Sequence, residues 1–496
     1  MIACIRGIIN IMNKTLNELT TVQRRVQPLL SQVARKSEYA FLVSVGLFSV
    51  GCSLPKAVGP DYKKPVSDLP SSYRFEPRKN GKTAAKRDAW WTLFKDKKLN
   101  EIIGQVRSSN EELKAAYARV KQSRANVRLS RSEYNPNISI SPSITRTGSS
   151  DDVNFDGSTA NQFRVPFDVT WEIDLFGRIR RSAEAASADY ESSYEDLNDL
   201  RLSLEADAAA RYFNLRALDG EIEIVQSEIA SRVESLKFIQ ERFELGTISQ
   251  LDVSRAKAEL AINKADLAVL KRARVTEEAA IALLAGKQAT SFKIAYAPLK
   301  AEAPRIPRAI PSELLRARPD IRSAERQLAS ANAQIGVATA SFYPSISLSG
   351  SVGLDAVSTE RLFQRRGTFW SIGPEIYIPV FSGGRNKSEL QISQAEYEEV
   401  LANYQQTVLR SLSEVETFLS STNLLTIQEI AQNQAVAASR EARATARDQY
   451  EGGVSDYLSL LDVERTALDA ERSQAILLGI EYVNTVNLIR SLGGSW

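Results

Sequence analysis

One cysteine is placed for covalent attachment of lipid. An apolar run at residues 40–50 follows the basic pair at 35–36 and ends two residues before Cys52. A basic flank, a short apolar stretch and small residues before the cleavage point are typical of a secretory signal. The run is shorter than the roughly 20 residues of a transmembrane helix. Cys52 is therefore predicted to be the acylated first residue of a lipoprotein after removal of residues 1–51. An ordinary signal peptide with an incidental cysteine is the alternative.

The acyl chains would anchor the chain in a membrane. Serine follows Cys52, where an aspartate would favour retention in the inner membrane. We therefore expect an anchor in outer-membrane lipid.

No other residue type is placed for catalysis or metal binding. The 496 residues include no histidine, which is the commonest metal ligand and the side chain best suited to proton transfer near neutral pH. Cys4 and Cys52 both lie near the N-terminus, which excludes a disulfide framework or a cysteine zinc site further along. The glycine-containing segments at 286–288 and 383–388 lack the Gly-Lys-Ser/Thr order of a phosphate loop. We expect no enzyme activity, no cofactor and no bound metal.

The positive net charge comes from the leader. The whole chain carries a formal charge of +3, but residues 1–51 contain six basic and two acidic residues, so the remainder carries −1. A protein that binds nucleic acid needs a basic surface to displace counterions from phosphates. The charge balance therefore predicts no nucleic-acid partner.

The chain contains a tandem repeat with an offset of 207 or 208 residues. The matched landmarks are Tyr134–Ile140 with Phe342–Leu348, Phe176–Arg178 with Gly383–Arg385, Ala188 and Tyr190 with Ala395 and Tyr397, Phe243–Gly246 with Tyr450–Gly453, and Leu283–Gly286 with Arg490–Gly493. Each copy reads as helix, strand, loop, strand, very long helix, tight turn and helix. The expected divisions are an N-terminal lipid-anchored segment at 52–98, a first repeat at 99–286, a linker at 287–312, a second repeat at 313–493 and a tail at 494–496.

Four strands are predicted from alternation of apolar and polar residues, at 137–146, 162–174, 345–354 and 369–380. In the second strand, one face carries Phe163, Val165, Phe167, Val169, Trp171 and Ile173, and the other carries Arg164, Pro166, Asp168, Thr170, Glu172 and Asp174. Strands of about ten residues with one apolar face fit a membrane barrel with a water-filled interior. A soluble sandwich is the alternative, but four strands between long helices offer no second sheet for packing.

Two very long helices are predicted at 178–243 and 385–450, because neither segment contains proline. In the first, apolar residues recur in alternating steps of three and four, with the one gap at Arg232. They are Leu215, Leu218, Ile222, Val225, Ile229, Leu236, Ile239 and Phe243. That spacing is typical of a coiled coil, and 65 residues at 1.5 Å each extend about 100 Å.

A four-stranded sheet in lipid must close with copies of itself, because open edges are not tolerated there. Two copies give eight strands, whose interior side chains would fill the lumen. Three copies give twelve strands and leave a passage. The sequence therefore favours at least a trimer.

Several motifs resemble the lipoprotein branch of the TolC family, the OprM and NodT-like proteins. They are Cys52, Val58–Tyr62, Trp90-Trp91, Arg318–Arg322, Ala331–Ala338 and Phe342–Ile346. The resemblance covers essentially the whole mature chain. It implies an α+β membrane protein, with a trimeric 12-stranded outer-membrane β-barrel continued by a periplasmic α-helical coiled-coil barrel. An equatorial belt would draw on residues 90–99, 289–311, part of 420–434 and the C-terminal tail.

The resemblance also implies a function and partners. A homotrimer would form a passive exit duct for small molecules, with a periplasmic adaptor and an inner-membrane pump of the resistance-nodulation-division (RND) type. The same duct serving protein export or metal-ion efflux is one alternative. A non-conducting coiled-coil envelope protein is another, from a different class.

By the same resemblance, the hairpin tips would dock the adaptor through Gly246, Thr247, Ile248, Ser249, Gly453, Val454 and Ser455. A structural reading is also open, in which the two glycines end helices and the serines and Asp456 cap the helices that follow.

The periplasmic gate would consist of Tyr450, Asp456 and Asp462, with Tyr450 packing beside an acidic ring from Asp462. No salt-bridge latch is expected at the tip, because Ser455 and Ser459 stand where some family members carry charges. The barrel lumen would contain Asp168, Glu172, Asp174 and Glu375, which could equally be ordinary solvated residues.

Overall fold

The computed structural model describes residues 56–65, 70, 72–75, 89–148, 159–304 and 318–494. Residues 57–496 form one compact unit. The predicted signal and the acylation site at Cys52 lie outside the described residues.

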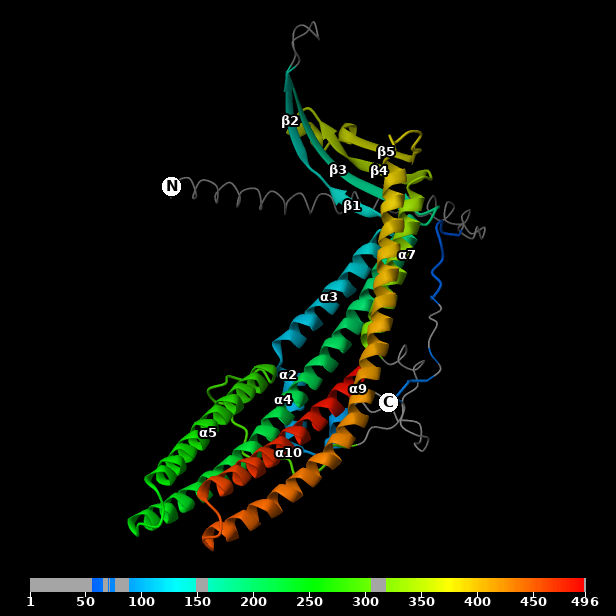
Figure 1. Ribbon diagram of the computed structural model, residues 1–496. Helices are drawn as coiled ribbons and strands as arrows, with labels where there is room; N and C mark the ends of the chain where they lie inside the picture. Colours follow the sequence, from blue (N-terminus) through cyan, green and yellow to red (C-terminus); the bar gives the residue numbers. More distant parts are fainter. Residues whose placement is uncertain are drawn as a thin grey trace, which may run out of the picture. The chain divides into compact units, whose positions relative to one another are not determined.

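The helices repeat in kind and in length (Figure 1). Two helices of 67 residues, α4 (Arg178–Glu244) and α9 (Arg385–Glu451), are each followed by a helix of 35 residues, α5 (Gln250–Leu284) and α10 (Tyr457–Ser491). The helices that precede the strands, α3 (Glu111–Ser132) and α7 (Pro319–Ala340), both have 22 residues. The shorter elements are η1 (Trp90–Phe94), α2 (Lys97–Ser109), α8 (Thr359–Leu362) and η2 (Arg365–Gly367). The predicted long helices are confirmed.

The strands form one antiparallel sheet. They are β1 (Asn137–Ile140), β2 (Ser143–Gly148), β3 (Thr159–Ile173), β4 (Ser345–Ala356) and β5 (Thr368–Tyr377). β1 and β2 both pair with β3, β3 pairs with β4, and β4 pairs with β5. Two predicted strands differ from the observed ones, and a proline lies close to each difference. The strand predicted at 137–146 is interrupted at Pro142, and the strand predicted to reach residue 380 ends at Tyr377, two residues before Pro379.

The register confirms the predicted alternation across the sheet. Ile140, Phe167, Val352 and Trp370 are successive neighbours in one row. The next row contains Ser139, Asp168, Ser351 and Ser371. Adjacent rows point to opposite faces, so one face is apolar and the other polar. Trp370 is 77% exposed, because no described element covers the apolar face.

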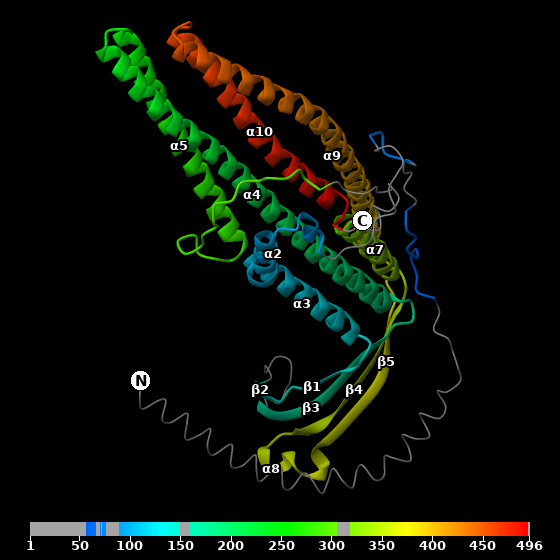
Figure 2. The same cartoon turned by 90° about the horizontal axis from the view of Figure 1, so that it is seen from below.

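All four strand–helix connections lie at the same end of the strands (Figures 1 and 2). α3 and α7 lead into strands within a few residues, and β3 and β5 lead out into α4 and α9 just as directly. The two helical hairpins, α4–α5 and α9–α10, therefore have their tips far from the sheet. α10 packs against both α4 and α9, while α5 packs against α4. Among the described residues, no helix combines the length and apolar character needed to cross a bilayer.

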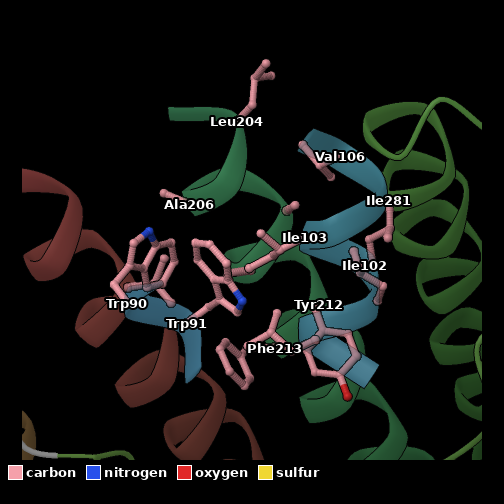
Figure 3. Close-up of a cluster of buried hydrophobic side chains, with 14 of the residues drawn as sticks. Trp90, Trp91, Ile102, Ile103, Val106, Leu204, Ala206, Tyr212, Phe213 and Ile281 are labelled. Carbon is pink, nitrogen blue, oxygen red and sulfur yellow. The ribbon is translucent and has the colours of Figure 1, made fainter. Parts of the chain in front are cut away.

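The main core surrounds Trp90 and Trp91, beside side chains of α2 and α4 (Figure 3). Trp90 donates a hydrogen bond to Glu205 at 3.3 Å, and the ring of Phe213 packs at a tilt against that of Tyr482 of α10, with 4.6 Å between the ring centroids. The segment after α5 joins this core through Ile294, which is 3% exposed. Two of the regions expected in a belt, at 90–99 and 289–304, thus meet in one cluster.

Asp219 ties the segment after α5 to α4. Its carboxylate is fully buried and lies 3.0 Å from Arg216 and 2.6 Å from Arg274. It also accepts a hydrogen bond from the Ala297 backbone N–H at 3.0 Å. Because two guanidinium groups balance one buried carboxylate, this site is held by charge as well as by packing.

Candidate functional site

The polar face of the sheet brings three of the predicted acidic residues together. Asp168 accepts hydrogen bonds from Ser141 at 3.1 Å and from Ser351 at 2.7 Å. Glu172 and Glu375 lie in one row, separated by Ser347. These carboxylates therefore share a single surface, as the alternation predicts.

Two of the four acidic residues predicted in the lumen, Glu172 and Asp174, pair with arginines of α4. Arg178 contacts Glu172 through two hydrogen bonds of 2.9 Å. Asp174 lies beyond the end of β3, where it accepts hydrogen bonds from the backbone N–H groups of Ile179 and Arg180 at the start of α4. Its carboxylate also pairs with the Arg180 side chain at 3.2 Å. Asp174 is thus a helix cap.

An arginine that the sequence analysis missed attaches the N-terminal segment to the strand–helix junction. Arg181 is nearly buried and donates to the Val58 carbonyl oxygen at 3.1 Å, and it pairs with Asp61 at 2.8 Å. Gly177, with φ of 88°, turns the chain here, and a Cβ at this position would lie 2.4 Å from that of Ala57. In the sequence, Arg181 is marked only as one of three arginines, with Arg178 and Arg180, at the start of the long helix α4.

The first hairpin tip is built as predicted from a glycine and a capping serine. Gly246 has φ of 71°, and the Thr247 N–H and hydroxyl both donate to the Arg242 carbonyl oxygen, at 3.0 and 2.8 Å. Ser249 and Asp252 form a capping box at the start of α5. Ile248 is half-buried against the apolar cluster between the hairpins, so it is less accessible than its neighbours.

The second tip follows the same plan with a different cap. Gly453 has φ of 74°, and Val454 beside it is 83% exposed. Asp456 caps α10 by accepting from the Ser459 N–H at 2.8 Å, and hydrogen bonds from Ser459 lower the pKa of Asp456. Ser455 donates to the Asp456 carbonyl oxygen instead, so the predicted cap is confirmed for Asp456 but is wrong for Ser455.

The three predicted gate residues are not in contact within one chain. Tyr450 is buried between the two hairpins, with its ring 5.7 Å from that of Tyr457 and with the Arg242 guanidinium 5.4 Å away. Burial raises the pKa of Tyr450, and its hydroxyl has no hydrogen-bond partner among the described residues. Asp456 and Asp462 are exposed on α10 and its cap. Arg242 could not be identified from spacing along the chain, because its partner, Tyr450, belongs to the other repeat.

The comparisons with known proteins agree with this architecture. A family model described as outer membrane efflux protein matches residues 102–287 and again residues 310–494. The solvent efflux pump outer membrane protein SrpC of Pseudomonas putida is 31% identical over 90% of this chain and 96% of its own. The cation efflux system protein CusC of Escherichia coli strain K12 is 28% identical over 91% of this chain and 98% of its own.

A solved structure extends the similarity to three dimensions. The outer-membrane channel OprN superposes with a TM-score of 0.84 and 33% identity, covering 88% of this chain and 99% of that one. Both matched ranges, the curated relatives and the shared fold show that the chain belongs to the outer membrane efflux protein family.

Proposed function

We propose that this outer-membrane protein is the passive exit duct of a tripartite efflux system. Three copies form the channel, a periplasmic adaptor docks on the hairpin tips, and an inner-membrane pump of the RND type supplies the energy. One observation carries the proposal: a sheet with an uncovered apolar face and unpaired edges continues directly into helices of 67 residues. Such a sheet suits contact with lipid, and such helices extend about 100 Å.

The unpaired edges support a trimer. Within the described part of the chain, β5 pairs only with β4, while β1 and β2 pair only with β3. If β1 and β2 count as one interrupted strand, each chain supplies four strands. Lipid does not tolerate open edges, and three copies closing edge to edge form a 12-stranded barrel with room for a passage.

The helices support the same ring. α5 packs on α4, α4 on α10, and α10 on α9, so α5 and α9 are the outer members of this layer. Both carry large apolar side chains that are more than half exposed, namely Ile262, Val269 and Val275 on α5 and Leu424, Ile427 and Ile430 on α9. Closure of the ring would bring α5 of one copy against α9 of the next and bury these side chains.

Three roles proposed for particular residues follow from the ring. Asp168 and Glu375 have no ion-pair partner among the described residues, and their negative charge on the polar face of the sheet would give the lumen a weak preference for cations. At the tips, Tyr450 with Asp456 and Asp462 would form the periplasmic gate, closed by the contact between hairpins and opened by the adaptor. Exposed Val454 would be the main adaptor contact.

We assign small organic molecules as the cargo class, because SrpC, a component of a solvent efflux pump, exceeds 30% identity over nearly the whole chain. Metal-ion efflux is the second candidate, supported by the relative named as a cation efflux protein.

Complementation separates these candidates. The full chain is expressed together with the matching pump and adaptor genes in a host that lacks its own outer-membrane duct. The proposal predicts restored tolerance to toluene and other apolar compounds. Restored tolerance to copper alone would favour metal-ion efflux, and no rescue with a correctly assembled trimer would contradict the duct.

A further inference from the structure

The apolar spacing of α4 has one gap, and the structure shows what fills it. The gap is Arg232, whose side chain is 2% exposed. Its guanidinium lies 2.7 Å from Glu228, one turn earlier in α4, and forms a short ion pair with Glu464 of α10, which is equally buried. A charge at a core position of a coiled coil is removed from water, so it is tolerated only where buried partners compensate it.

A fourth side chain completes the arrangement from α9. Arg447 contacts Glu464 at 3.1 Å and donates a hydrogen bond to Ser231 of α4 at 2.9 Å. Burial raises the pKa of Glu228, and the neighbouring Arg232 opposes that rise. Glu228, Arg232, Arg447 and Glu464, which we call the ionic cluster, thus join both hairpins with two positive and two negative charges.

Apolar contacts flank the ionic cluster on both sides along the helices. Towards the tips, Ile239 of α4 packs with Tyr450 of α9 and Leu460 of α10. Away from the tips, Ile222 and Val225 of α4 pack against Leu270 of α5, within the first hairpin. Apolar contacts are non-directional and permit one helix to slide along another, whereas each buried charge needs a partner atom within hydrogen-bond distance. The ionic cluster, together with the 3.5 Å pair of Arg472 with buried Glu221 further from the tips, therefore specifies axial register at the α4–α10 interface, as a polar core residue does in coiled coils.

We propose that the ionic cluster fixes the register of the two hairpins and is the pivot about which their tips separate when the entrance opens. This inference rests on the proposed function, because it takes the tips to be a gated entrance. Glu244 follows Arg232 by 12 residues, so the tip extends about 18 Å beyond the cluster. Over that length Tyr450 of α9 meets α4 through the ring of Phe238, 6.4 Å away between centroids, and through a hydrogen bond from Arg242 to its carbonyl oxygen.

Distances between spin labels on α4 and α10 test the pivot in full-length trimers diluted with unlabelled chains. The tip-side pair is Glu241→Cys with Ser459→Cys, and the far-side pair is Gln226→Cys with Ser473→Cys; all four positions are exposed. Each pair is measured with and without Tyr450→Ala, which should open the entrance. The tip-side distance is expected to increase while the far-side distance stays constant. Equal increases in both pairs would overturn the pivot.

Single-channel conductance of the same trimers separates the two proposals. A higher conductance with both distances increased refutes the pivot and leaves the duct standing. A conducting trimer that Tyr450→Ala does not open refutes the gate, and with it the pivot. Trimers that never conduct contradict the duct itself.

Removing one charge distinguishes register from ordinary packing. Glu464→Gln keeps the shape of the side chain, and we expect the far-side distance to shift by about 5 Å, one helical turn. The matched control is Arg465→Gln, which removes the ion pair between the next residue of α10 and Glu259 of α5, where the arginine is 53% exposed. If Glu464→Gln does not assemble, Arg447→Gln at the edge of the cluster replaces it. Identical far-side distances in the cluster variant and the control would contradict the proposal.

Discussion

A lysine at Ile372 tests which face of the sheet contacts lipid. Ile372 lies in the middle of β5, is 69% exposed and shares its row with Ile138, Val169 and Gly350. A lysine on the lipid face of a barrel costs about 2–4 kcal/mol at the bilayer midplane and less near the interfaces. Because each trimer carries three copies, Ile372→Lys should destabilise the assembly by about 6–12 kcal/mol if the row lies near the midplane.

The adjacent residue is the matched control. Ser371 points to the opposite face and lies in the row of Asp168 and Ser351, so a lysine there meets water and a nearby carboxylate. The assay is urea unfolding of the protein reconstituted in lipid vesicles, with heat dissociation of the trimer in parallel. We expect Ile372→Lys to unfold at much lower urea and Ser371→Lys to resemble the wild type. Greater damage from Ser371→Lys would refute the assignment of the apolar face to lipid.

Three residues of the helical part give further expected outcomes. Burial, together with two nearby carboxylates, raises the pKa of Glu481 to about 7, so the native state binds this proton more tightly than the unfolded chain does. Stability should therefore fall as pH rises towards 7, and Glu481→Gln should flatten the dependence of melting temperature on pH. Asp219→Asn removes the buried charge between Arg216 and Arg274 and should cost about 3–5 kcal/mol in denaturant titrations. Tyr450→Phe removes a buried hydroxyl without a described partner and should leave thermal stability unchanged or slightly higher, whereas Tyr450→Ala should cost about 3–5 kcal/mol.

The sequence predicted most of the architecture because the signals are periodic and local. Alternation with a period of two assigned Phe167 and Asp168 to opposite faces, and the register with Val352 and Ser351 confirms it. The absence of proline predicted both long helices. The break at Pro142 is also a local signal, but the alternation of Ile138, Ile140 and Ile144 continues across it.

The charge contacts could not be predicted, because they depend on the path of the backbone. Glu172 forms an ion pair with Arg178 because the chain turns between them at Gly177. Arg232 was visible as a gap in the apolar spacing, but its partner Glu464 is 232 residues away in the other repeat. Spacing within one helix cannot identify a partner on another.

Single-channel conductance of the purified protein in planar bilayers, with its mass determined in parallel, tests the central claim most directly. The account predicts a mass of three chains and a conductance that is low in the wild type and rises in Tyr450→Ala. A monomer, or a trimer that stays silent in every tip variant, would contradict the exit duct and favour a non-conducting coiled-coil protein of the envelope.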